Sequence, residues 1–478
     1  MLHRMKASKF SLVCSCVILS AWAVMQGCAD PAGKEAGGSE ASRMEEAEAE
    51  LPDSLYFWEH IAPIAVQRCT PCHHEGGAGP FPLQAYSDFA RRLKTVHLAI
   101  ADGFMPPWPA DPNYSRFKNE KVLKPYEKQA LLAWIKQGGK EGRVDSSTAH
   151  LLQSFPQSVS HAQADYIASF PDTVHIEAGR GDRFYYAKIP FELERDTFIS
   201  AFSFKPGNRQ LVHHVNGHLI NYEEGQKSDL YAGSWLEDAE VRSSIHAYRD
   251  MNIPNDDGSF PSLRVSAFNY LPGVEAQLYP PGLGSMRLAK KGVLLLNTLH
   301  YGPSAVDTFD LSEVHFHFAE KAPERPLLEL HLGTQGISAV KPTFIIPAGE
   351  VKRFETRYRL EEDISVLTVN PHMHLLGKSF RAFATSPDKA DTIPLIHIPE
   401  WDFRWQYFYT YPQILPIPKG YEVVVEAVFD NSINNPHNPN SPPKTMQAAG
   451  ANMKTTDEMF QFFLNYLSYR EGDENISL

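Results

Sequence analysis

The chain has 478 residues, of which 43% are hydrophobic and 21% are charged, and its formal net charge at pH 7 is −12. This composition is that of an ordinary globular protein and excludes a disordered chain, a collagen and a polytopic membrane protein. A protein that binds nucleic acid usually carries a stripe of basic residues. None is visible in this sequence, so we expect no nucleic acid partner. Only two of the five cysteines follow residue 28, which excludes a disulfide-stapled architecture.

The first 27 residues have the pattern of an export signal. Three basic residues precede an apolar stretch over 10–24, which is short for a membrane span and typical of a signal-peptide core. The stretch leads into Met25-Gln26-Gly27-Cys28, which resembles a bacterial lipobox and implies lipidation of Cys28; an ordinary secretory signal is the alternative. Residues 28–50 predict a flexible linker. We therefore expect a lipoprotein of the bacterial cell envelope, anchored to the membrane and facing the periplasm or the exterior.

A haem attachment signature follows in Cys69-Thr70-Pro71-Cys72-His73. The two thiols can bond the haem vinyl groups, and the adjacent histidine then reaches the iron from the same loop. A disulfide or half of a zinc site is the alternative, but a zinc site would need a second pair of ligands. We expect Met105, in a proline-rich loop, to be the sixth ligand of the iron, with three histidines as rivals: His60, His74 and His97.

Apolar residues at helical spacing predict three helices around this signature, over 57–65, 87–102 and 126–137. Helices before and after a haem loop resemble a small class I cytochrome c. We therefore expect a small all-α cytochrome c domain over 51–145, followed by a linker over 146–174.

From about residue 175 the pattern changes to short apolar or alternating segments separated by turns, which is typical of β-sandwiches. The clearest of these segments are 199–204, 293–299, 313–318, 366–369 and 421–429. About 300 residues are enough for two such domains.

Histidines recur in three tight settings of this region. His213 and His214 are adjacent, and both can serve one metal only where the strand is distorted or ends, because neighbours on a strand point to opposite faces. His300 ends an apolar strand. His372 and His374 are two residues apart, so a strand would place both imidazoles on one face.

Near the C-terminus, Met459 ends the run Thr455-Thr456-Asp457-Glu458-Met459. Imidazole and thioether ligands together point to copper, because a soft sulfur favours Cu(I). Four other histidines in the region are predicted to be structural: His218, His315, His317 and His397. Of these, His315 and His317 have the same two-residue spacing as the metal-ligand pair.

In their order along the chain, the motifs H-H, L-H-Y-G, H-M-H-L-x-G-K and T-x-D-E-M resemble those of the copper type II, ascorbate-dependent monooxygenases. This family includes peptidylglycine α-hydroxylating monooxygenase and dopamine β-monooxygenase. The resemblance covers about 175–478 and implies two jelly-roll-like β-sandwich domains, 175–330 and 331–478, with one copper on each. It implies that the electron-transfer copper is held by His213, His214 and His300. It also implies that the catalytic copper, which binds O2, is held by His372, His374 and Met459.

The chain departs from the family where peptide-amidating members anchor a peptide carboxylate. Asn370, Gln461 and Phe463 stand where those members have Arg, Asn and Tyr. This argues against glycine-extended peptides as substrates, and Phe463 favours a less polar pocket.

We therefore expect a multidomain protein with a small all-α cytochrome c domain followed by two all-β jelly-roll-like sandwich domains. The expected activity is that of an oxidoreductase, a copper monooxygenase that hydroxylates a C–H bond of a small organic substrate with O2. Its cofactors would be two copper ions and one covalently bound haem c, which relays electrons from an external donor to the His213/His214/His300 copper. The alternatives are a non-catalytic electron-transfer or copper-binding surface lipoprotein, and a recognition module without copper.

Overall fold

The computed structural model describes residues 50–478 apart from 76, 78, 119, 154–162, 273, 275, 277–279, 281 and 449–456. The predicted signal over 1–27, the lipidation site Cys28 and all but the last residue of the predicted linker lie outside the described residues. Residues from Glu50 to Leu478 form one compact unit. Within the described part of the chain, no helix is both long enough and apolar enough to cross a membrane.

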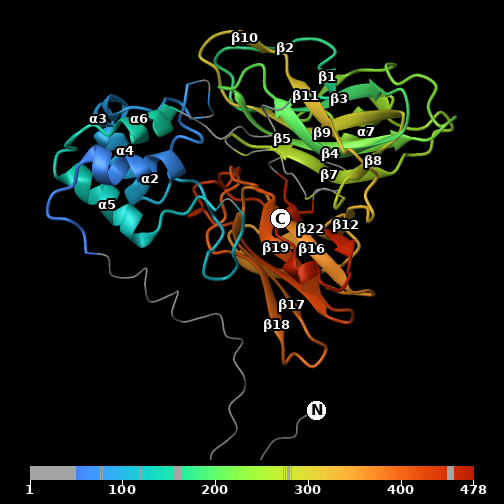
Figure 1. Cartoon of the computed structure of the whole chain (residues 1–478). Helices are drawn as coiled ribbons and strands as arrows, with labels where there is room; N and C mark the ends of the chain where they lie inside the picture. The colour runs from blue at the N-terminus through green and yellow to red at the C-terminus, as the bar shows by residue number, and fades with distance from the viewer. Residues whose placement is uncertain are drawn as a thin grey trace, which may run out of the picture. The chain divides into compact units, whose positions relative to one another are not determined.

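Helices come first along this unit and are short (Figure 1). They are η1 (Phe57–Ile61), α2 (Ala62–Arg68), α3 (Tyr86–Ala90), α4 (Leu93–Ala101), α5 (Pro125–Lys136) and α6 (Ser146–Gln153). The three predicted helical stretches are thus present, with the second divided into α3 and α4. Their apolar faces meet at Phe57, whose ring lies 5.2 Å from that of Phe89 and 5.7 Å from that of Trp134. All three rings are fully buried, so periodicity alone located this small core.

Strands dominate from residue 166 onward. The first half of this region forms a five-stranded antiparallel sheet, β6-β3-β9-β5-β7, and a four-stranded one, β1-β11-β4-β8, with a small pair β2-β10. Apolar residues of both large sheets share one core, which includes Ile189, Phe202, Leu294 and Phe316. The elements are β1 (Tyr166–Ser169), β2 (Val174–Ile176), β3 (Arg183–Glu192), β4 (Thr197–Lys205), β5 (Val212–Tyr222), β6 (Leu236–Asp238), α7 (Ser244–Asp250), β7 (Leu263–Tyr270), β8 (Met286–Leu288), β9 (Lys291–Tyr301), β10 (Thr308–Asp310) and β11 (Glu313–Phe318).

The second half repeats this pattern with a four-stranded sheet, β12-β22-β16-β19, a five-stranded one, β13-β15-β20-β17-β18, and a small pair β14-β21. Their shared core includes Phe354, Val369, Phe380 and Phe462. The elements are β12 (Leu328–Gly333), β13 (Val340–Lys341), β14 (Ile345–Ile346), β15 (Val351–Arg359), β16 (Ile364–Met373), β17 (Gly377–Thr385), β18 (Thr392–Ile398), β19 (Tyr409–Ile417), β20 (Glu422–Asp430), β21 (Met446–Gln447), β22 (Phe460–Ser468) and η3 (Asp473–Asn475).

The strand segments that alternation and apolar runs predicted are present. The segments 199–204, 293–299 and 313–318 fall in β4, β9 and β11. The segments 366–369 and 421–429 correspond to β16 and β20.

The predicted fold class is nevertheless wrong. In place of a small all-α cytochrome c domain followed by two jelly-roll-like sandwich domains, residues 50–478 form one compact and mostly β unit. No described helix is longer than the 12 residues of α5, and the structure shows no separate all-α domain.

The prediction of a separate helical domain fails because of the proline-rich segment between α4 and α5. This segment is irregular and packs on the C-terminal sheets. Ala110 and Phe117 are buried in the core of the C-terminal sheets. The amide of Asp111 donates a hydrogen bond to the carbonyl of His397 at 2.8 Å, and that of Lys118 donates to Thr410 at 2.7 Å. These contacts join the helical segment to strands that are almost 300 residues away, a link that no local pattern encodes. The residue ranges given above for the individual domains stay predictions.

Candidate functional site

Neighbouring strands β5 and β9 bring the first histidine motifs together. The register pairs His214 with His300 and shifts between Val212 and His214, so β5 is irregular where the two adjacent histidines follow one another. A distortion of this kind is what adjacent histidines need in order to share a metal. The ring centroids of His213 and His214 each lie 4.8 Å from that of His300. We call His213, His214 and His300 the first cluster.

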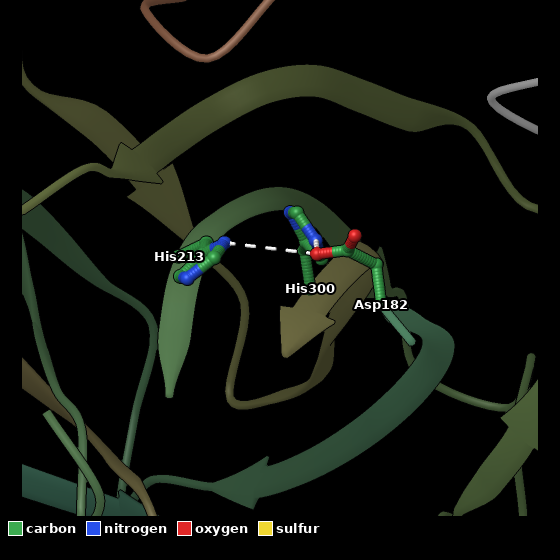
Figure 2. Close-up of side chains that lie close together, drawn as sticks. All are labelled: Asp182, His213 and His300. Atoms are coloured by element: carbon green, nitrogen blue, oxygen red, sulfur yellow. Dashed lines mark hydrogen bonds and ion pairs between the residues drawn. The ribbon is translucent and has the colours of Figure 1, made fainter. Parts of the chain in front are cut away.

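Asp182 belongs to the same site and was missed by the sequence analysis. Its Oδ1 lies 2.8 Å from Nε2 of His300 and 3.9 Å from Nδ1 of His213 (Figure 2). Metal-binding atoms of Asp182, His213 and His300 all lie within 4.8 Å of one another. Asp182 precedes β3, and a lone aspartate in a polar turn carries no spacing signal. Only the pairing of β3 with β9 shows that it lies beside His300.

The first cluster is electrostatically prepared to bind a cation. Burial, reinforced by His300, lowers the pKa of His214 well below its usual value, and burial also lowers the pKa of His213. The hydrogen bond with His300 lowers the pKa of Asp182. Neutral imidazoles beside an ionised carboxylate are the protonation states that bind metals.

Packing fixes the rings of this cluster. The ring of Phe184 stacks on that of His300, with centroids 4.2 Å apart and planes inclined by 17°. A Cβ at Gly302 would lie 2.4 Å from Nε2 of His213, so the glycine of the L-H-Y-G motif leaves the space that this ring occupies.

His372 and His374 lie at the end of β16, and their rings are neighbours as the spacing predicted, with centroids 5.0 Å apart. Nδ1 of His372 lies 2.5 Å from Oε1 of Gln406, and Nδ1 of His374 lies 2.9 Å from the carbonyl oxygen of Asp457. Because both acceptors are oxygens, each Nδ1 carries the proton and each Nε2 carries the lone pair that can bind a metal.

Met459 is buried and lies in a segment tied to the same turn. The carboxylate of the preceding Glu458 accepts the amide hydrogens of His374 at 3.0 Å and Leu376 at 2.6 Å. Burial raises the pKa of Glu458 to about 8. These bonds bring the chain of Met459 to that of His374, although the two residues are 85 positions apart in the sequence. We call His372, His374 and Met459 the second cluster; the two threonines of its methionine motif lie outside the described residues.

One loop contacts both clusters. It comprises residues 401–407, between β18 and β19, and we call it the connecting loop. The ring centroid of Phe403 lies 5.9 Å from that of His214 and 5.6 Å from that of His374, so these imidazoles lie no more than about 12 Å apart. Nε1 of Trp401 donates a hydrogen bond to the carbonyl of His374 at 3.2 Å.

The haem attachment signature follows α2. Nδ1 of His73 lies 3.0 Å from the carbonyl oxygen of Phe81 and therefore donates to it, which leaves the lone pair on Nε2. A backbone carbonyl in this role fixes the ring and the tautomer of an iron-binding histidine. Burial raises the pKa of the Cys69 thiol to about 12, and Cys72 is partly exposed.

Met105 is partly buried in the loop that follows α4, and its amide donates to the carbonyl of Ala99 at 2.9 Å. Of the rival ligands, His60 and His74 contact backbone atoms through Nδ1, at 3.1 Å from the amide nitrogen of Tyr56 and 2.9 Å from the carbonyl oxygen of Thr70. Met105 as the sixth ligand, and His97 as a rival, stay predictions.

The Met105 loop also lies against the connecting loop. The hydroxyl of Tyr407 donates to the carbonyl of Pro107 at 2.9 Å, and the rings of Trp108 and Tyr407 lie 5.4 Å apart.

Two of the histidines interpreted as structural, His315 and His317, each contact a polar side chain. Nε2 of His315 lies 2.9 Å from Glu313, and Nε2 of His317 lies 3.1 Å from Oγ of Ser203. His218 is buried, and burial lowers its pKa to about 4, which keeps it neutral.

Comparisons with known proteins assign no family to the chain. No family model matches it, and no curated protein matches it. Among solved structures, that of the infectious bursal disease virus Gt strain covers 66% of this chain and 73% of its own, at 11% identity and a TM-score of 0.15. That of the Gx strain covers 67% and 80%, at 10% identity and the same TM-score. At such TM-scores these similarities carry no inference about fold or function.

Proposed function

We propose that the protein is a copper-dependent monooxygenase that hydroxylates a C–H bond of a small organic substrate with O2. In this proposal it receives electrons through a covalently bound haem c. The observation that carries the proposal is the position of Phe403, whose ring contacts His214 of the first cluster and His374 of the second. Two groups of imidazoles with one aromatic ring between them suit two metal ions that exchange electrons.

The donor sets of both clusters fit copper. The first cluster offers three imidazoles, and in His213 and His214 burial and repulsion from neighbouring histidines lower the pKa and favour the neutral form. The second offers two imidazole lone pairs and the thioether of a buried methionine, a combination that favours Cu(I). When bound, copper supplies one-electron redox chemistry and the activation of O2.

The protein's own side chains orient the ligands. Gln406 holds the ring of His372, and the indole of Trp401 holds the backbone of His374. The amide Nδ2 of Asn370 donates to the carbonyl of Tyr407 at 2.8 Å, so it is engaged within the protein. This contact supports a substrate without the carboxylate that peptide-amidating members anchor at this position.

The signature Cys69–His73 would hold the haem, with His73 as the first iron ligand. The hydrogen bond of His73 to Phe81 supports this role, because it presents Nε2 as the ligating atom. The contact of Tyr407 with Pro107 supports electron passage from this segment toward the copper sites.

Elemental analysis of one sample, matured in a periplasm that attaches haem c, tests the proposal. We expect about two copper ions per iron, covalent haem on a denaturing gel, and oxidation of the reduced haem when O2 and substrate are added. Iron without copper after reconstitution, or reduced haem that stays reduced, would overturn the proposal.

The contact through Phe403 also favours a second candidate, a non-catalytic electron-transfer lipoprotein, because electron exchange between the clusters requires no substrate. Screening for substrate-dependent O2 uptake by the copper-loaded protein separates the two candidates. Metal-dependent electron transfer without any O2 uptake would identify the second.

A further inference from the structure

The structure assigns Asp182 to the first cluster as a positioning residue, an inference that rests on the proposed function. We propose that Asp182 holds His300 through Nε2, so that copper binds on the Nδ1 side of His300 together with His214. On this view Asp182 is not itself a metal ligand, although its carboxylate lies within reach of two histidines.

The two nitrogens of His300 face different partners. Nε2 lies 2.8 Å from Oδ1 of Asp182, and Nδ1 lies 3.1 Å from Nδ1 of His214. A neutral imidazole carries one proton, and a carboxylate can only accept one. The proton of His300 therefore belongs on Nε2, and its lone pair on Nδ1 points at His214.

The separation of the two Nδ1 atoms suits a metal between them. A metal that binds two imidazole nitrogens at about 2.0–2.1 Å with an angle of 90–109° holds those nitrogens about 2.8–3.4 Å apart. The observed 3.1 Å between His214 and His300 lies in that range. The 3.9 Å between Asp182 and Nδ1 of His213 lies outside it.

Two further contacts keep His300 in this orientation. Phe184 stacks on the ring, with centroids 4.2 Å apart, and so restrains its plane. The side chain of His214 is buried, whereas that of Asp182 is 53% exposed. The Nδ1 edge of the His300 ring therefore faces the protein interior, and the Nε2 edge, which contacts Asp182, faces the solvent. A carboxylate behind a metal-binding histidine is a recurring device that fixes the ring and increases its basicity.

The test uses the full chain loaded with Cu(II) and three variants, Asp182→Asn, Asp182→Ala and His214→Ala. The matched control is Glu177→Gln, which alters an exposed carboxylate paired with Arg180. Copper affinity is measured by competition with a chelator. The number of nitrogen and oxygen ligands is measured by electron paramagnetic resonance and X-ray absorption, and neither readout depends on activity.

We expect Asp182→Ala to weaken copper binding at the first cluster by about 10–100-fold while three nitrogen ligands remain. Asp182→Asn keeps an acceptor oxygen, so its copper affinity should fall less. The control Glu177→Gln should bind copper with unchanged affinity. In His214→Ala the copper should have one nitrogen ligand fewer. The proposal is overturned if Asp182→Ala removes an oxygen ligand, if His214→Ala removes no nitrogen ligand, or if both Asp182 variants bind copper as the unmodified protein does. A protein that binds no copper in any form would instead refute the proposed function, and this inference with it.

Discussion

Oε1 of Gln406 lies 2.5 Å from Nδ1 of His372 and accepts the proton of that ring. Gln406 belongs to the connecting loop and His372 to the end of β16, so this bond ties the loop to the second cluster. The backbone carbonyl of Gln406 is itself fixed, because Nδ2 of Asn269 donates to it at 3.0 Å.

Replacement of Gln406 by leucine should weaken metal binding at the second cluster. Without the acceptor, the ring of His372 is free to turn and to exchange tautomers, and a lost outer partner costs about 10–100-fold in metal affinity. Copper titration of the full chain measures the effect. Gln413→Leu, at an exposed position of β19, is the control and should bind copper as the original chain does. Equal affinities for the two variants would refute the role of Gln406.

Replacement of Gly302 by alanine should displace the ring of His213. The added Cβ would lie 2.4 Å from Nε2 of that ring, closer than real Cβ contacts allow. We expect copper affinity at the first cluster to fall by about tenfold or more, while the second cluster keeps its copper. Gly181→Ala serves as the control, because a Cβ at Gly181 meets nothing within 4 Å. Unchanged copper spectra in Gly302→Ala would contradict the prediction.

Replacement of Met105 by leucine tests the sixth haem ligand. Bonds from Cys69 and Cys72 to a haem would not depend on Met105, so we expect the haem to stay attached while the visible spectrum changes to that of an iron lacking a thioether ligand. Met251→Leu, at a fully buried position of another hydrophobic core, is the matched control. If the spectrum of Met105→Leu is unchanged, one of the rival histidines is the ligand.

Replacement of Phe117 by alanine tests whether the helical segment and the C-terminal sheets form one unit. The ring lies 5.0 Å from that of Tyr409 and 5.3 Å from that of Tyr411, and its loss should cost about 3–5 kcal/mol of unfolding free energy. Urea unfolding, followed by circular dichroism and by tryptophan fluorescence, should show both signals moving together. The control Phe309→Ala, at a 64% exposed ring, should change little. If the helical signal unfolded in a separate, earlier transition, the helical segment would be an independent domain and this prediction would be wrong.

The ion pair of Asp473 with Arg325 should make the free energy of unfolding depend on pH in the acidic range. Burial by itself would raise the pKa of Asp473, but hydrogen bonds from Arg325 and Ser365 outweigh it and lower the pKa to about 2. Because the pKa in the folded state is below that of the unfolded chain, near 3.8, the bond stabilises fully above pH 4. That stability is lost as the pH falls toward 2.

Asp473→Asn should lower the unfolding free energy at pH 7 by about 3–5 kcal/mol, because Arg325 then stays buried without its counter-charge. The difference between the variant and the original chain should shrink between pH 4 and pH 2. A difference that is constant across this range would show that the pair is not the cause.

The sequence could predict elements with strong periodicity and residues with informative spacing. Strand alternation located β4, β9 and β11, and the two-residue spacing of His372 and His374 predicted that their rings are neighbours, although β16 ends at Met373 between them. The spacing could not reveal Asp182 or Gln406, which reach their histidines through tertiary packing from other parts of the chain. For the same physical reason the fold class was mispredicted, because Phe117 is buried against strands far along the chain and not against its neighbouring helices.

The irregular start of β5 leaves its two histidines unequally exposed, since His214 is buried and the side chain of His213 is 47% exposed. An ion that entered the first cluster from the solvent side would therefore meet His213 first and His214 last, and on leaving by the same path it would part from His214 first and from His213 last. A metal held by this cluster would thus exchange with the solvent past one ring at the surface, so replacement of His213 should change the rate at which a chelator strips the cluster.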